Sequence, residues 1–189
     1  MIAGIVLAAG ESKRMGRPKQ LMRVGQTTLL NRVVDAALES KLDAVYVVLG
    51  HLANQVEASL RQRDRVSVVL NPDYAEGLGS SVRAGVAALP PEADAAMFLL
   101  GDQPFLPVGL LNQLIAKSTP ENIVAPLVDG ERKNPTIFAR AFFSELLHVT
   151  GDSGGRTVIQ AHPEALVLVE TSEPLLDVDT PEDAAALFS

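Results

Sequence analysis

The chain has 189 residues, a formal net charge of −7 and no cysteine. This length suits one domain with a sizeable core, and the lack of cysteine excludes thiol catalysis, cysteine zinc sites and a disulfide framework. An acidic surface repels a phosphate backbone, so we expect no nucleic-acid partner. The apolar residues 1–10 are too few to span a bilayer and lack the basic flank of a signal peptide. We therefore expect a cytoplasmic protein without a membrane partner.

Strand and helix patterns alternate along the chain. Apolar runs predict strands over 2–9, 44–49, 66–70, 95–100, 123–128, 136–139 and 165–169, with a long loop over 10–25 and turns at 71–72 and 129–130. Helical spacing predicts helices over 30–38, 53–62, 80–89, 107–117, 141–148 and 155–161, and a capping box opens a last helix at Thr180. This alternation predicts one α/β domain with a mostly parallel sheet, whose ligands bind at the carboxyl ends of the strands.

The loop after the first strand is the most informative stretch of the sequence. It reads Leu7-Ala8-Ala9-Gly10-Glu11-Ser12-Lys13-Arg14-Met15-Gly16-Arg17-Pro18-Lys19-Gln20. Small residues let a backbone approach a ligand closely, and successive N–H groups can form a nest for an anion. Arg14 and Lys19 add the charge that phosphate groups need. The spacing fits neither a P-loop nor a G-x-G-x-x-G fingerprint. We predict a phosphate site here, with an ordinary charged surface loop as the alternative.

This loop also resembles the signature L-A-A-G-x-S-x-R-M-G-x-x-K of the MobA-like nucleotidyltransferases, and within them the molybdenum cofactor cytidylyltransferases. Four further segments resemble family blocks in the family's order: a base-recognition turn at 77–81, a metal-binding turn at 101–104, a block at 151–156 and a closing block at 177–183. The resemblance covers almost the whole chain. It implies a three-layer α/β/α arrangement, with a Rossmann-like nucleotidyltransferase sheet in a single domain over 1–189.

The resemblance implies a Mg²⁺-dependent enzyme in which an acceptor phosphate attacks the α-phosphorus of a nucleoside triphosphate and pyrophosphate leaves. The implied catalytic residues are Arg14, Lys19 and Asp102, and the implied Mg²⁺ ligands are Asp102 and Asp179. The implied nucleotide-binding residues are Leu7, Ala8, Ala9, Gly10, Ser12, Arg14, Lys19, Gly77, Gly79, Ser80 and Ser81. Judged by residue type alone, these positions could equally have structural roles. Aspartates are common in turns after strands, and glycine and serine are common where helices begin.

The choice of substrates follows from finer details of the resemblance. Ala9 stands where guanylyl members carry a second glycine, which favours CTP over GTP. The acceptor implied is molybdopterin, with a molybdoenzyme as partner. The sequence has Lys133-Asn134-Pro135 where these enzymes usually have Gly-His-Pro, and Arg23 where they have proline. A sugar or polyol phosphate acceptor and a nucleotide-binding accessory protein therefore stay open.

The residues expected on the acceptor side are polar residues in or near loops. They are Lys133, Asn134, Asp152 and Arg156. The alternative for these residues is a polar connection between strands.

Overall fold

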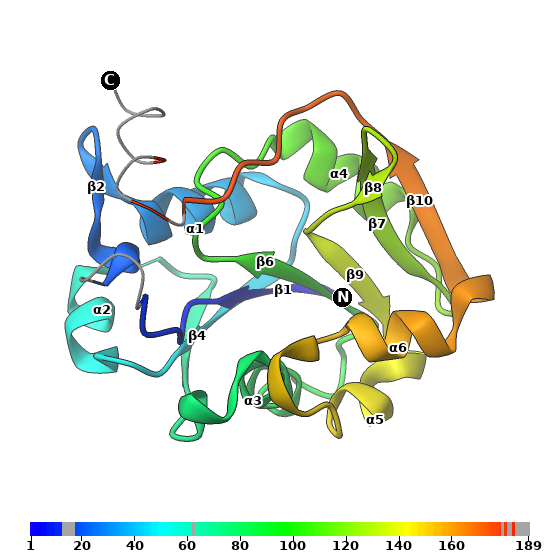
Figure 1. Cartoon of the computed structure of the whole chain (residues 1–189), viewed down its shortest axis with the longest axis horizontal. Coiled ribbons are helices and arrows are strands. Elements are labelled where there is room, and N and C mark those ends of the chain that lie inside the picture. The colour runs from blue at the N-terminus through cyan, green and yellow to red at the C-terminus, as the bar shows by residue number, and fades with distance from the viewer. Residues whose placement is uncertain (13–17, 62, 179, 181–182, 184–189) are drawn as a thin grey trace.

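The computed structural model describes residues 1–12, 18–61, 63–178, 180 and 183. Within these residues eight strands form one sheet in the order β10-β7-β9-β6-β1-β4-β5, with β8 paired to β7 (Figure 1). The strands are β1 (Ile2–Leu7), β4 (Ala44–Leu49), β5 (Val66–Leu70), β6 (Ala95–Leu100), β7 (Ile123–Val128), β8 (Glu131–Arg132), β9 (Thr136–Ala139) and β10 (Leu166–Glu170). A separate antiparallel pair joins β2 (Arg23–Val24) to β3 (Thr27–Thr28).

The sheet is mostly parallel, as the sequence predicts. β6, β1, β4 and β5 run parallel to one another, and so do β7 and β10. β9 runs antiparallel between β6 and β7. β1 lies near the middle, where Ile5 is fully buried and pairs in register with Tyr46 and Phe98. A continuous apolar run of this kind is typical of a parallel strand that is covered on both faces.

Helices cover both faces of the sheet and complete the three layers. α1 (Leu29–Glu39), α2 (Ala53–Ser59) and α4 (Val108–Lys117) pack into one apolar cluster, and α3 (Leu78–Ala87), α5 (Phe143–Leu146) and α6 (Arg156–Ala161) pack into another. Figure 1 shows α1 and α4 on one side of the central strands and α3, α5 and α6 on the other. This arrangement leaves the carboxyl ends of β1 and β6 open between the two helical layers.

Several expected boundaries differ from the structure, each for a local reason. The predicted loop 10–25 holds a 3-10 turn, Lys19–Leu21, and strand β2, which is too short to show a period. α3 begins two residues before the predicted start, because Gly77 and not Ser80 is its N-cap. The 129–130 turn leads from β7 into β8, a two-residue strand that is missing from the expected elements. Within 141–148 only Phe143–Leu146 is α-helical, after a 3-10 turn at Arg140–Phe142.

The predicted capping box near the end of the chain is confirmed. The Thr180 N–H donates to Asp183 Oδ2 at 2.8 Å, and the Asp183 N–H donates to Thr180 Oγ1 at 3.1 Å. The rest of the expected last helix lies outside the described residues. Across the described part of the chain, every helix is too short or too polar to cross a bilayer.

Candidate active site

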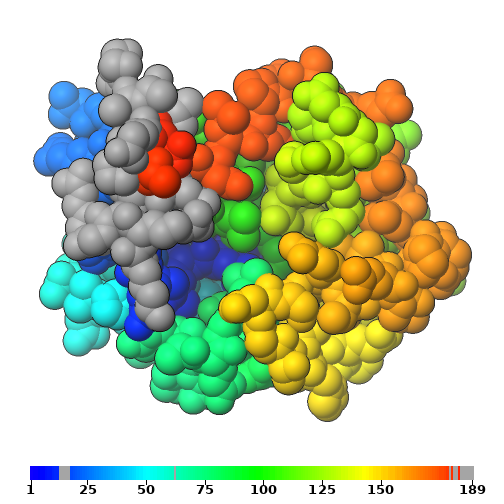
Figure 2. Space-filling view, in the orientation of Figure 1, coloured from blue at the N-terminus to red at the C-terminus, as the bar shows by residue number. Residues whose placement is uncertain are grey.

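A pocket of ≈ 480 Å³ opens at the carboxyl ends of β1 and β6, which is where ligands bind in a parallel sheet. Its volume falls in the range of small-molecule sites. In Figure 2 the surface is hollowed where the blue, green and gold segments meet. Its described walls are Leu7, Ala8, Ala9, Gly10, Glu11, Ser12, Lys19, Gln20, Tyr74, Ala75, Gly77, Leu78, Ser81, Leu100, Gly101, Asp102 and Asp152.

The first wall of this pocket is the loop after β1, which Gln20 holds in shape. The Gln20 side chain is 3% exposed, and its amide donates to the carbonyls of Ala8 at 3.0 Å and Gly10 at 2.9 Å. The Lys19 N–H donates to Ser12 Oγ at 3.1 Å. Together these bonds fix the two limbs of the loop on either side of residues 13–17. Gln20 is a supporting residue that sequence reasoning missed, although it directly follows Lys19, the last residue of the signature.

The second wall is the turn after β6, which comes very close to the end of β1. A Cβ atom added to Gly101 would lie 3.1 Å from the Leu7 carbonyl oxygen and 3.1 Å from Ala8 Cβ. Small residues at these positions therefore let the two strand ends touch. The contact brings Asp102, which follows Gly101, beside the loop that carries Lys19.

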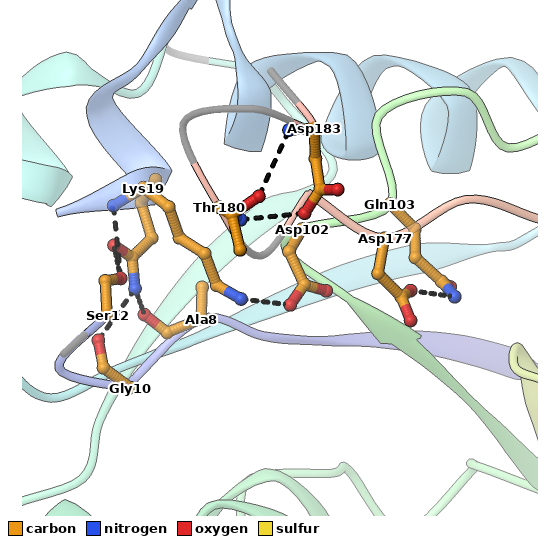
Figure 3. Close-up of polar contacts among 10 residues, drawn as sticks. Ala8, Gly10, Ser12, Lys19, Asp102, Gln103, Asp177, Thr180 and Asp183 are labelled. Carbon is orange, nitrogen blue, oxygen red and sulfur yellow. Dashed lines mark hydrogen bonds and ion pairs between the residues drawn. The ribbon is translucent and has the colours of Figure 1, made fainter. Parts of the chain in front are cut away.

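Lys19 and Asp102 form an ion pair between Nζ and Oδ2 inside the pocket (Figure 3). Each side chain is 18% exposed, so both charges are largely shielded from water. The other carboxylate oxygen of Asp102, Oδ1, is buried and has no hydrogen-bond partner among the described residues. A buried oxygen without a donor is costly, unless a ligand or cation satisfies it.

Asp102 Oδ1 is therefore the atom best placed to hold a metal ion. Mg²⁺ takes carboxylate oxygens and usually keeps several waters and substrate phosphate oxygens in its shell. The described residues contain no group of three acidic, histidine or cysteine side chains that could hold a metal. One aspartate with water and phosphate oxygens is compatible with Mg²⁺ and not with a tightly caged metal.

The closing block of the sequence reaches this same turn. The Val178 N–H donates to the Asp102 carbonyl at 2.9 Å, and Gln103 Nε2 donates to Asp177 Oδ1 at 2.7 Å (Figure 3). The residue after Val178 is Asp179, the second expected metal ligand. Both Asp179 and the expected phosphate contact Arg14 lie outside the described residues.

The third wall is the start of α3, where glycine is required by close packing. Gly77 has φ +105°, and an added Cβ would lie 2.5 Å from Asp152 Oδ1. The same Asp152 oxygen accepts a hydrogen bond from the Leu78 N–H at 3.3 Å. An added Cβ on Gly79 would lie 2.9 Å from the carbonyl carbon of Thr150. The 150–152 segment thus packs directly against the 77–81 turn.

The two serines of that turn have different positions. Ser81 lines the pocket, whereas Ser80 and Gly79 are absent from its walls. Asn71 Nδ2 donates to both hydroxyls, at 2.9 Å to Ser80 and 3.1 Å to Ser81, and the Ser80 hydroxyl donates to the Gly77 carbonyl. The Ser80 hydroxyl therefore stabilises the helix start, and the pocket surface is left to Gly77 and Ser81.

A smaller pocket of ≈ 100 Å³ adjoins the first and shares Leu7, Leu78, Leu100 and Asp152 with it. We call it the side pocket. Of the residues expected on the acceptor side, Asn134, Asp152 and Arg156 line it. Lys133 lines neither pocket, because its ammonium pairs with Glu131 at 2.6 Å. Arg132 lines the side pocket although nothing in the sequence singles it out.

Taken together, the pocket has the parts of a nucleotide-binding transferase: a backbone loop and a lysine after the first strand, and an aspartate at the end of a neighbouring strand. The MobA-like NTP transferase domain matches residues 4–166 of the chain. The chain therefore belongs to the MobA-like NTP transferase family, whose members use a nucleoside triphosphate. From here on we call the larger pocket the nucleotide pocket.

Curated relatives align over nearly the full length of the chain. Molybdenum cofactor cytidylyltransferase of Escherichia coli (strain K12) is 26% identical over 95% of this chain and 91% of its own. Purine catabolism protein PucB of Bacillus subtilis (strain 168) is 33% identical over 96% and 93%. Nicotine blue oxidoreductase of Paenarthrobacter nicotinovorans is 30% identical over 99% and 96%. The names of these relatives indicate different activities, so membership of the family does not by itself determine the acceptor.

Solved structures agree with the fold. A Mycobacterium sp. strain JC1 homologue of Mycobacterium tuberculosis Rv0371c has a TM-score of 0.90 at 31% identity, and covers 99% of this chain and 94% of its own. Rv0371c from strain H37Rv in complex with manganese has a TM-score of 0.83 at 29% identity, over 99% and 97%. A nucleotidyl transferase from Methanothermobacter has a TM-score of 0.86 at 25% identity, over 100% and 96%.

Proposed function

We propose that the protein is a Mg²⁺-dependent cytidylyltransferase that transfers CMP from CTP to the phosphate of molybdopterin and releases pyrophosphate. The observation that carries this proposal is the pairing of Lys19 with Asp102 in the nucleotide pocket, where Asp102 Oδ1 has no partner within the described part of the chain. A binding protein needs no such shielded carboxylate beside its phosphate site, since a carboxylate repels phosphate unless a cation lies between them.

The reaction needs positioning and charge neutralisation more than covalent chemistry. An oxygen of the acceptor phosphate forms a bond to the α-phosphorus, the bond from that phosphorus to the bridging oxygen breaks, and pyrophosphate leaves with the electron pair. A phosphate monoester is largely ionised at neutral pH, so no general base is required. The Lys19 ammonium neutralises charge near the α-phosphate, and Arg14 is expected to bind the β- and γ-phosphates.

Asp102 would hold the Mg²⁺ ion, with Asp179 expected as a second ligand. The ion supplies Lewis acidity at the phosphate oxygens when it is bound. With the cation held by Asp102, the Lys19 ammonium would no longer be needed to neutralise this carboxylate and would be available to contact the triphosphate. A structural relative solved in complex with manganese supports the use of a divalent cation.

The choice of CTP and molybdopterin is supported by Ala9 and by the similarity to the E. coli molybdenum cofactor cytidylyltransferase. The test is pyrophosphate release with each of the four common NTPs, with Mg²⁺ and with molybdopterin as acceptor. We expect release with CTP, and a loss of about 100-fold or more in Asp102→Asn, because one electrostatic contact in a reacting site is commonly worth that much.

The matched control is Asp64→Asn, which makes the same change at an exposed aspartate outside both pockets and leaves the rate unchanged. Release with another NTP would overturn the base choice, and release only with a sugar or polyol phosphate would overturn the acceptor. Tight NTP binding without release on any acceptor would favour the accessory-protein alternative.

A further inference from the structure

The side pocket has two kinds of wall. Its polar wall carries Arg132 from β8 and Arg156 from the start of α6, with Asn134 beside them. Its apolar wall includes Phe98 and Phe138, whose rings meet edge to face with centroids 5.7 Å apart. Two guanidinium groups therefore share a small cavity with aromatic carbon.

Within the described part of the chain these two arginines have no partner of opposite charge, in contrast to Arg63 and Arg83. Arg63 pairs with Asp35 at 2.6 Å and Arg83 pairs with Glu76 at 2.7 Å. Across the described residues, neither Arg132 nor Arg156 has a side-chain hydrogen bond or an ion pair. Asp152 lies in the same wall, but its Oδ1 accepts the Leu78 N–H.

The placement of Arg132 and Arg156 in one small pocket has an electrostatic cost. Burial lowers the pKa of the Arg132 guanidinium from its ordinary value, and the nearby positive charge of Arg156 lowers it further. Both groups stay charged, because an arginine does not lose its proton in a protein. Two like charges that share a partly buried cavity are stabilised by an anion bound between them.

We propose that Arg132 and Arg156 bind the phosphate monoester of the acceptor, and that the acceptor carries this phosphate on an apolar or aromatic body. This inference rests on the proposed function, and it names the contacts of the second substrate. The side pocket shares Leu7, Leu78 and Asp152 with the nucleotide pocket, so a phosphate held there lies next to the nucleotide.

The size of the side pocket and its apolar wall indicate which class of substrate it binds. A cavity of ≈ 100 Å³ takes a phosphate group and a few further atoms, and not a whole cofactor. Guanidinium groups match phosphate oxygens with paired hydrogen bonds. Phe98 and Phe138 offer no hydrogen bond, so the hydroxyl groups of a polyol would lose water there without replacement.

The test follows the Nε–H signals of arginine in the full-length protein by NMR, with inorganic phosphate as the probe. Arg132→Gln and Arg156→Gln assign the two signals. We expect both signals to shift together and to saturate, and each variant to weaken phosphate binding at the remaining arginine by about tenfold or more. Because neither side chain has a partner to lose among the described residues, both variants are expected to unfold at the temperature of the native protein.

Lys117→Gln is the matched control, because it removes one positive charge at an exposed residue of α4, outside both pockets. It is expected to leave the phosphate affinity unchanged. The proposal is overturned if phosphate shifts neither signal, if Arg132→Gln leaves the affinity at Arg156 as it was, or if Lys117→Gln weakens binding equally.

Two further readouts separate this inference from the proposed function. Phenyl phosphate is expected to bind the side pocket more tightly than glycerol 3-phosphate, and equal affinities would overturn the apolar-body part of the inference. In the transfer assay, Arg132→Gln is expected to raise KM for the acceptor and to leave KM for the NTP unchanged. Saturable phosphate binding at both arginines without any transfer would contradict the proposed function and leave the phosphate site standing.

Discussion

The two pockets share a border but are built in different ways. The nucleotide pocket is tightly braced: Gln20 bonds to two carbonyls of its own loop, and the Lys19 charge is paired with Asp102. In the side pocket the two arginines have no partners among the residues that the structure describes, and they come from the two-residue strand β8 and the six-residue helix α6. A pocket whose charges are neutralised within the protein can keep its shape without a ligand. A pocket with two unpaired like charges is completed by its ligand.

The largest expected effect on activity is in the nucleotide pocket, from the substitution Lys19→Met. The substitution keeps the length of the side chain and removes its charge, so the triphosphate loses one charge-assisted contact and Asp102 loses its ion pair. We expect kcat/KM for the NTP to fall by about 100-fold, with KM for the acceptor unchanged. Steady-state kinetics in both substrates measures this, with thermal unfolding to establish that the variant is folded.

A fall of less than threefold would mean that Lys19 serves the structure of the loop and not the triphosphate. An equal rise in both KM values would mean that the two pockets do not act separately, and the comparison between them would fail.

The two pockets also differ in how much of their structure can be predicted from the sequence. The nucleotide pocket is formed by one dense stretch, 7–20, and by the turn after β6. The rule that parallel strands end at one edge of the sheet is enough to bring Lys19 and Asp102 together. Gln20 is missed as a support because its role depends on where the Ala8 and Gly10 carbonyls point, and a pattern of residue types does not specify that.

The side pocket depends on long-range placement, which the sequence does not give. β8 has two residues and no detectable period, and β9 lies antiparallel between β6 and β7. Alternation of strands and helices predicts the class of the fold but not this order. The meeting of Arg132 with Arg156 results from the order of the strands, so only Arg156, inside a family block, could be chosen from the sequence.

The next effect concerns the border between the pockets, where Gly77 touches the 150–152 segment. Gly77→Ala places a Cβ 2.5 Å from Asp152 Oδ1 at a residue with φ +105°. We expect a loss of about 2 kcal/mol in the free energy of unfolding, because a non-glycine residue in this region is strained and the segment must shift. The measurement is chemical denaturation, and KM for both substrates should rise because the shift disturbs both walls.

Gly109→Ala in α4 is the control for this change. An added Cβ there meets nothing within 4 Å and the residue is helical, so we expect no loss and a gain of at most about 1 kcal/mol. If Gly77→Ala behaved like Gly109→Ala, the close packing of 150–152 on α3 would not be a feature of the protein in solution.

The smallest expected effect comes from a comparison of two neighbouring residues, Arg132 and Lys133. Lys133 follows Arg132 directly, yet it is on the outside of both pockets and pairs with Glu131 at 2.6 Å. That pairing raises the pKa of Lys133 and lowers the pKa of Glu131, both exposed to solvent. Exposed pairs contribute little, so we expect Lys133→Gln to change KM for the acceptor by less than about twofold.

The contrast with Arg132→Gln is informative because both substitutions remove one positive charge from neighbouring residues. If the acceptor were attracted only by the overall positive charge around β8, the two variants would weaken acceptor binding equally. Both effects would then disappear at high salt. A specific phosphate site requires the arginine to have the larger effect at every salt concentration, since its guanidinium lines the side pocket and the Lys133 ammonium does not.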